Sequence, residues 1–177
     1  QEPLDEDSRA GKDDFGSQLC VAWEEEARRA EALGMRVVLL RTAPVFASDG
    51  GMLPRLRLPF SMGLGGRLGN GRQWMPWIHL DDLVGTILFC MAHESLDGAI
   101  NGTSPNPVTN QTFTNTLGKA LKRPTFFPMP EIMIKLLMGQ MGEELLLSGK
   151  KIVPAKIVNA GYAFKYQRIE DALLDIV

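Results

Sequence analysis

Hydrophobic and polar positions alternate with different periods along this chain. Residues 35–40 form a continuous apolar run, which favours a strand covered on both faces, as in a parallel sheet. Before it, apolar residues recur at helical spacing over residues 15–32, and Gly34 follows as a stop signal. The order helix, glycine, strand is half of an α/β crossover unit.

The strongest local pattern lies at residues 73–88. Aromatic and β-branched residues over 74–80, interrupted by Pro76, predict an edge strand or an extended segment. Asp81 or Asp82 then stands where a helix N-cap is needed, and apolar residues at helical spacing predict a buried helix after it. A strand that runs into a capped helix is a usual wall of a ligand site in α/β proteins.

The other segments predict short elements separated by turns. Apolar spacing, Pro, Gly and capping residues predict a helix over 53–62 around Pro59, a strand over 98–102, a helix capped by Thr109 or Asn110 that reaches Leu121, an apolar helix over 131–147 behind Pro130, a short helix from Pro154 to Gly161, a short strand over 162–166 and a helix over 169–177.

Composition narrows the class of protein. The 177 residues are 45% hydrophobic with a net charge of -2, which is typical of a globular domain and argues against nucleic-acid or anionic-membrane partners. No run approaches the roughly 18 apolar residues of a membrane span. Cys20 and Cys90 lie in apolar helical patterns and are predicted to be buried free thiols, as in a cytoplasmic protein. With two His and no clustered Cys, no metal site is predicted.

Glycines gather at residues 63–71, which makes this segment a candidate phosphate-binding loop. A dinucleotide fingerprint needs a strand before the glycines and a helix after them, and this segment has neither. We therefore expect a tightly turned surface loop. The alternative is a loop that covers a substrate, with Arg67 or Arg72 meeting an anion.

His79, Asp81 and Asp82 resemble an acid–base group. Neighbours two and three residues apart across a strand–helix boundary more often pack and cap than relay protons, so a junction histidine is the favoured interpretation. Trp74 and Trp77 fit two interpretations equally well, stacking on a flat ligand or anchoring the core.

Taken together, three motifs carry a family resemblance: RTAPVF after an apolar strand, QWMPWIHLDDLVGTIL, and AINGTSPNPVTNQTF, in that order. The chain resembles the extended short-chain dehydrogenase/reductases, and most of all their atypical NAD-dependent epimerase/dehydratase-like branch with an extra C-terminal segment. The resemblance implies an α/β fold with a Rossmann-like partial parallel sheet and a small C-terminal α+β cap. It implies a reductase-type part over residues 1–122 and a cap over 123–177.

The resemblance also implies the site. It places Arg41, Thr42, Ala43 and Val45 beside the nicotinamide end of NADP or NAD. It places Arg72, Trp77 and His79 around a small-molecule substrate. The family's Tyr-x-x-x-Lys pair is absent from residues 15–32, and Tyr162 with Lys165 has the wrong spacing, so the catalytic residues are unknown.

The implied function is the C-terminal part of an NAD(P)-dependent oxidoreductase-type protein, which supplies the substrate-cleft wall and the nicotinamide-side contacts. The family's pyrophosphate-binding glycine turn is not in this sequence, which begins with Gln1 rather than Met. We therefore expect the chain alone to be inactive and to need a missing N-terminal half or a homo-oligomer partner. The alternative is a non-catalytic nucleotide-binding-like or protein-interaction module whose strand over 35–40 offers an unpaired edge.

Overall fold

The computed structural model describes residues 2–8, 11, 15–134, 136 and 146–177. The helices are α1 (Phe15–Arg28), the 3-10 helix η1 (Arg29–Leu33), α2 (Leu53–Ser61), α3 (Leu80–Ala92), α4 (Asn110–Ala120), α6 (Ala155–Asn159) and α7 (Ile169–Ile176). The strands are β1 (Val38–Thr42), β2 (Val45–Phe46), β3 (Trp74–Met75), β4 (Ile78–His79), β5 (Gly98–Gly102) and β6 (Val108–Thr109). The mixed α/β class predicted from the sequence is confirmed.

The strands form three two-stranded sheets. β1 pairs in parallel with β5 from Val38–Gly98 to Thr42–Gly102, and β2 pairs in parallel with β4. β3 and β6 are antiparallel. Within the described residues, the other edge of β1 has no strand partner. The prediction of a partial parallel sheet is therefore confirmed.

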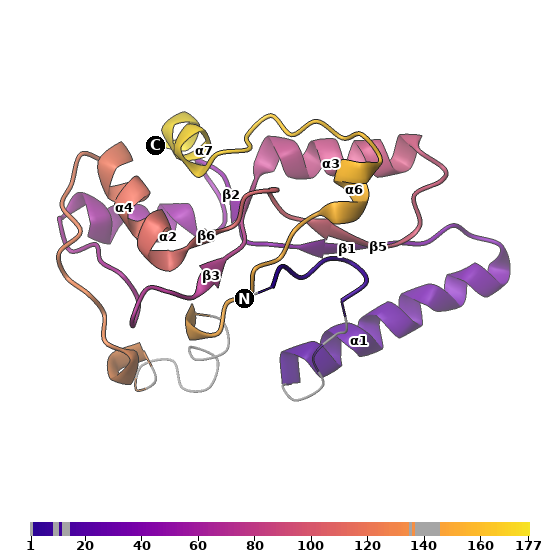
Figure 1. Ribbon diagram of the computed structural model, residues 1–177, viewed down its shortest axis with the longest axis horizontal. Helices are drawn as coiled ribbons and strands as arrows, with labels where there is room; N and C mark the ends of the chain where they lie inside the picture. Colours follow the sequence, from indigo (N-terminus) through magenta and orange to yellow (C-terminus); the bar gives the residue numbers. More distant parts are fainter. Residues whose placement is uncertain (1, 9–10, 12–14, 135, 137–145) are drawn as a thin grey trace.

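Figure 1 shows α3 and α6 on one side of β1 and β5 and α1 on the other, at one end of the long axis. At the opposite end, α2, α4 and α7 gather around β2 and β3. One apolar cluster lies at each end. Ile78, Ile100 and Ile157 are the fully enclosed members of the first, while Phe46, Trp77 and Leu173 lie in the second.

Several element predictions are confirmed. Gly34 ends η1 in the left-handed region at a φ of 78°, which a side chain would strain. Thr109 caps α4 by accepting the Thr112 N–H at 3.2 Å. The helices predicted around Pro59, after Pro154 and over 169–177 are present as α2, α6 and α7. Of the helix predicted over 131–147, residues 131–134 are helical and most of the rest lies outside the described residues.

The segment 74–80 contains strands, as predicted, but they are two short strands in different sheets. Three other predictions were wrong in detail. Residues 162–166 form no strand. β1 begins three residues later than predicted and is only partly buried. Cys20 is exposed, although Cys90 is buried as expected.

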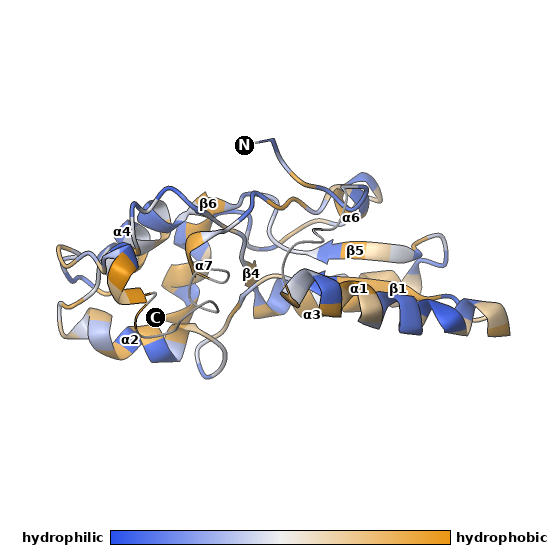
Figure 2. Cartoon of the chain, turned by 90° about the horizontal axis from the view of Figure 1, so that it is seen from below, coloured by the Kyte–Doolittle hydropathy of each residue, from blue (hydrophilic) through white to orange (hydrophobic). Residues whose placement is uncertain are grey.

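The helices beside β1 are less covered than their patterns predicted. No residue of α1 is buried, and α3 exposes five large hydrophobic residues, Leu80, Val84, Ile87, Leu88 and Met91. Figure 2 shows such hydrophobic positions along both helices. The periodicity correctly identified an apolar face on each helix, but among the described residues little packs against those faces. No helix of the described part is both long and apolar enough to cross a membrane.

The second cluster gives a test of this packing. Leu173 is 0% exposed, whereas its neighbour Leu174 is 68% exposed on the same helix, α7. We expect Leu173→Ala to lower the free energy of unfolding by about 2–5 kcal/mol, because it leaves a cavity in the core. Urea denaturation followed by circular dichroism measures the change.

Leu174→Ala is the matched control, since it removes the same atoms from an exposed position and should change stability by less than about 0.5 kcal/mol. Equal losses in the two variants would contradict the assignment of Leu173 to the core.

Candidate functional site

The ends of the parallel strands bring the predicted cofactor residues together. Arg41 and Thr42 end β1, Val45 begins β2, and the N–H of Ala43 between them donates to the Gly102 carbonyl at the end of β5 at 3.0 Å. In open α/β sheets, ligands collect at the carboxyl ends of strands. Thr42 is exposed there, and Ala43 and Val45 are half-buried.

Arg41 is held by helix α1 rather than being free. Its Nε and Nη2 donate to the two carboxylate oxygens of Glu24 at 2.6 and 2.8 Å. This two-point contact lowers the pKa of Glu24 and raises that of Arg41. The sequence analysis missed Glu24, because nothing in the helical pattern marked it as the partner of a strand-end arginine.

Trp77 belongs to the core. It is 0% exposed, its ring stacks on Phe46 with centroids 5.8 Å apart, and its Nε1 donates to the Asn106 carbonyl at 3.1 Å. Of the two interpretations of its ring, the core anchor is the one that this placement supports. An enclosed ring has no free face for a substrate, so we correct the assignment of Trp77 to the substrate group.

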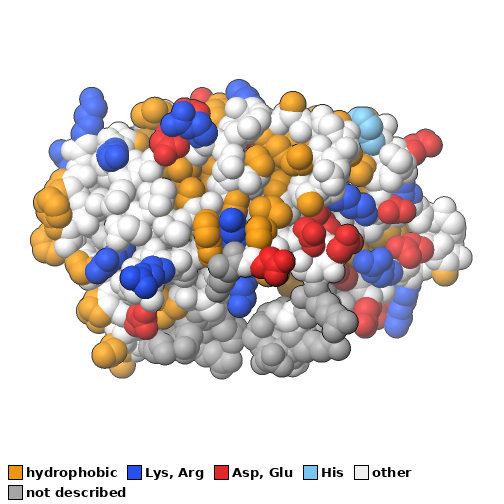
Figure 3. Space-filling view, in the orientation of Figure 1, with side chains coloured by type: hydrophobic (Ala, Val, Ile, Leu, Met, Phe, Trp, Pro, Cys, Tyr) orange, Lys and Arg blue, Asp and Glu red, His pale blue; other side chains and the backbone are white. Residues whose placement is uncertain are grey.

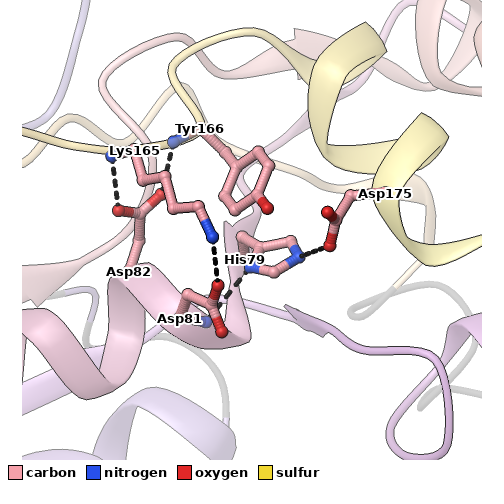
Figure 4. A network of polar contacts seen from close by, with 6 residues as sticks. All are labelled: His79, Asp81, Asp82, Lys165, Tyr166 and Asp175. Carbon is pink, nitrogen blue, oxygen red and sulfur yellow. Dashed lines mark hydrogen bonds and ion pairs between the residues drawn. The ribbon is translucent and has the colours of Figure 1, made fainter.

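His79 takes the capping role predicted for Asp81 or Asp82. Its Nδ1 accepts the Asp81 N–H at 3.1 Å at the start of α3. A neutral ring that accepts at Nδ1 carries its proton on Nε2, and Nε2 lies 3.4 Å from Asp175 Oδ2 of α7. The Tyr166 ring covers the imidazole, with centroids 3.9 Å apart. Figure 4 shows this arrangement.

His79 is therefore a junction residue, as the favoured interpretation of the sequence held. The ring is buried between β4 and the C-terminal segment, which leaves it no open face for the predicted substrate contact. Asp175 and Tyr166 were both missed by the sequence analysis, since they lie more than 80 residues away and carry no motif of their own.

Asp82 ties the same two parts of the chain together. Its carboxylate is almost fully buried and accepts the N–H groups of Lys165 at 2.7 Å and of Tyr166 at 2.8 Å. Tyr162 adds a hydrogen bond from its hydroxyl to the Asp82 carbonyl at 3.2 Å. The structural role predicted for Asp82 rests on these contacts.

Tyr162 and Lys165 do not form a catalytic pair. The pKa of the Tyr162 hydroxyl is raised, mainly because the group is partly buried. Lys165 Nζ lies 2.8 Å from Asp81 Oδ2, and this contact raises the pKa of the lysine and lowers that of the aspartate. The Tyr162 hydroxyl donates to a backbone carbonyl and the Lys165 ammonium group pairs with a carboxylate, so both side chains are engaged in contacts within the fold.

The glycine-rich segment is a turned loop, as expected. It follows helix α2, and its Leu68 N–H donates to the Asn110 side chain at 2.8 Å, which holds the loop against the start of α4. Arg72 is exposed, and its N–H donates to Asn70 Oδ1 at 2.8 Å. Of the predicted substrate residues, Arg72 alone has an exposed side chain. Among the described residues, no group of His, Cys, Asp and Glu is arranged to hold a metal ion.

The Asp82 contact makes a test. We expect Asp82→Ala to lower the free energy of unfolding by about 2–4 kcal/mol, because the buried N–H of Tyr166 and the half-buried N–H of Lys165 lose their acceptor. Asp81→Ala is the control, since its exposed ion pair should contribute less than about 1 kcal/mol. Chemical denaturation of both variants measures the difference, and a loss for Asp82→Ala no larger than for the control would contradict the assignment.

The Glu24–Arg41 contact predicts a pH dependence. The pKa of Glu24 is lowered from its ordinary value of 4.5. Its contribution is therefore complete above pH 4.5 and is lost as the pH falls through the lower folded-state value. We expect the free energy of unfolding of wild type, measured by urea denaturation, to fall more steeply below pH 4.5 than that of Glu24→Gln. The extra loss should be about 1 kcal/mol or less because the pair is partly exposed. Parallel pH profiles of the two proteins would count against this contact.

Comparisons with known proteins identify the fold. The model of the NAD dependent epimerase/dehydratase family matches residues 12–101, and a domain of unknown function, DUF1731, matches residues 129–176. The epimerase family protein ML0860 of Mycobacterium leprae is 44% identical over 170 residues, which cover 96% of this chain and 55% of that protein.

Two solved structures are similar over nearly the whole chain. The human epimerase family protein SDR39U1, crystallised with NADPH, has a TM-score of 0.89 and 34% identity, covering 99% of this chain and 59% of that one. The nucleoside-diphosphate sugar epimerase from Corynebacterium glutamicum has a TM-score of 0.80 and 32% identity, covering 99% and 33%. The chain spans about half the length of the curated relatives that it matches. On the family match and the shared fold, this chain belongs to the NAD dependent epimerase/dehydratase family.

Proposed function

We propose that this chain forms the nicotinamide-side and substrate-side part of an NAD(P)-dependent oxidoreductase-type protein. The observation that carries the proposal is the meeting of the carboxyl ends of β1 and β5, just before β2 begins, where the Ala43 N–H donates to the Gly102 carbonyl. In an open parallel sheet this edge is where a dinucleotide binds. The human relative of the same fold was crystallised with NADPH, which supports the same cofactor class here.

At this edge, Thr42, Ala43 and Val45 would contact the nicotinamide end through their backbone groups. Arg41 would act by holding helix α1 against the end of β1, since its Nε and Nη2 both donate to the Glu24 carboxylate. The catalytic residues are not assigned, because neither Tyr162 nor Lys165 is placed for proton transfer. The protein would work in a reducing compartment such as the cytoplasm, in keeping with its two free thiols.

The proposed substrate is a small sugar- or nucleotide-like molecule. The support is the similarity to the Corynebacterium glutamicum structure, which is described as a nucleoside-diphosphate sugar epimerase. Arg72, exposed on the glycine-rich loop, is the residue that would meet an anionic substrate group. Residues 1–122 would form the reductase-type part and residues 123–177 the cap.

A second proposal is a non-catalytic interaction module. It is favoured by the open edge of β1 and by the exposed hydrophobic residues of α3, which together invite a strand and a helix from another polypeptide. Light scattering of the isolated chain tests this proposal, and a monomer that no partner stabilises would count against it.

The cofactor proposal predicts a difference between the chain and the full-length protein. The sequence of this chain lacks the glycine turn that binds the pyrophosphate, which supplies much of the dinucleotide's binding surface in this fold. We expect full-length protein to bind NADPH or NADH, and the 177-residue chain to bind at least about a hundredfold more weakly. Isothermal titration calorimetry with both nucleotides measures the two affinities.

Circular dichroism of the isolated chain serves as the control, since it shows whether the chain is folded during the titration. Micromolar binding by the folded chain would overturn the expectation of an incomplete site. Absence of binding by the full-length protein would overturn the cofactor proposal itself.

A further inference from the structure

The small net charge of the chain conceals a separation of charge. Residues 50–80 and 98–130 contain seven of the 19 Lys and Arg residues and none of the 21 Asp and Glu residues. The rest of the sequence therefore holds 12 basic and 21 acidic residues. A charge excess of +7 in 64 residues creates a positive field that the total of -2 does not reveal.

These two basic stretches meet at one end of the molecule. The Met129 N–H donates to the Arg67 carbonyl at 2.9 Å, and Arg123 Nε donates to the Ser61 carbonyl at 2.8 Å. The Gly66 backbone lies against the Phe127 carbonyl so closely that a side chain at position 66 would collide with it. The loop after α2 and the segment after α4 thus form one connected surface.

Large hydrophobic side chains protrude from this surface. Phe126 is 80% exposed, and Leu58 is 68% exposed. We call the exposed apolar and basic residues of segments 57–67 and 119–127 the basic–apolar surface. Its apolar members are Leu58, Met62, Leu64, Phe126 and Phe127, and its basic members are Arg57, Arg67, Lys119, Lys122 and Arg123. Figure 3 shows hydrophobic side chains along this end, on the left of the view.

This surface lies away from the open edge of the sheet. In Figure 1, β1 and α1 lie toward one end of the long axis, whereas α2 and the segment after α4 lie at the other. A strand that continued the sheet would pair with β1, so it would not need to cover the basic–apolar surface. A patch of this kind, apolar with a polar rim, marks an interaction site.

We propose that the basic–apolar surface docks on an anionic lipid bilayer, with the Phe and Met side chains entering the headgroup region and the Lys and Arg side chains contacting lipid phosphates. Apolar side chains that protrude, beside cations that reach toward the interface, suit a flat lipid surface. Charge complementarity selects anionic lipid. A second copy would have to offer its acidic end, and such a head-to-tail contact does not close into a dimer. The protein would lie on the membrane and not span it, in contrast to the expectation from net charge that it has no membrane partner.

The experiment is co-sedimentation of the full-length protein with vesicles of phosphatidylcholine alone or with 30% phosphatidylserine. We expect binding to the anionic vesicles, little binding to neutral ones, and release of the protein at about 0.5 M NaCl because salt screens the attraction. This salt test uses the unmodified protein, so it does not depend on any variant folding.

Two double variants then separate the contributions. Phe126→Ser with Phe127→Ser removes the apolar insertion, and Lys119→Gln with Lys122→Gln removes two cations, and each pair should weaken the partition by about tenfold or more. The matched controls, Leu33→Ser with Leu174→Ser and Arg28→Gln with Arg29→Gln, change exposed residues elsewhere and should bind like wild type.

No binding to anionic vesicles, equal binding to neutral ones, or equal losses in the control variants would each overturn the proposal. Sedimentation without vesicles would overturn it in favour of self-association. Because the readout needs no nucleotide, failure here leaves the proposed cofactor binding unaffected.

Discussion

The buried carboxylate of Asp82 joins the start of α3 to the C-terminal segment. Asp82 lies in the first turn of α3, where the helix dipole favours a negative charge, and its oxygens accept the N–H groups of residues 165 and 166. Charge-assisted hydrogen bonds in a buried setting are among the stronger polar contacts, and a carboxylate left without them would be costly to bury. The position of the C-terminal segment, including Tyr166 over His79, follows from this contact.

The region that matches DUF1731 is thereby packed against the part of the chain that matches the epimerase/dehydratase family. Asp175 faces His79 Nε2 from α7, and Tyr162 donates to the backbone of α3. Trp77 is enclosed in a cluster to which α4 and α7 both contribute. The strand that precedes α3 is therefore held from several sides.

Much of the secondary structure was predictable from the sequence, because it depends on interactions between residues close together in the chain. Gly34, Thr109 and the apolar spacing over 169–177 act through neighbours within a turn, and the structure confirms each. The N-cap of α3 was predicted at Asp81 or Asp82 because aspartate is a common N-cap residue. In the structure, the N-cap is His79, whose ring accepts the Asp81 N–H. Residues 162–166 alternate like a strand, but their N–H groups at 165 and 166 bond to a side chain instead of a neighbouring strand.

The site was predicted less well, because it depends on pairings between distant residues. Nothing near Arg41 in the sequence points to Glu24, and nothing near His79 points to Asp175. The aromatic residues were ambiguous for a physical reason: a Trp side chain serves equally well inside a core or on a ligand, and only the burial of Trp77 between Phe46 and the Asn106 carbonyl decides. Total charge is similarly uninformative about a surface, since a sum over the chain discards where the charges lie.

The bond between Asp82 and residues 165–166 has a consequence for biosynthesis. Its partners are separated by more than 80 residues, and Leu4 is likewise bonded to Lys151 and Val153, almost the length of the chain away. The ribosome synthesises α3 long before residues 165–166, whose N–H groups donate to Asp82 in its first turn. Until the C-terminal segment is synthesised, the Asp82 carboxylate lacks its hydrogen-bond donors and the apolar face of α3 is uncovered. Chaperones therefore have more time to bind the nascent chain.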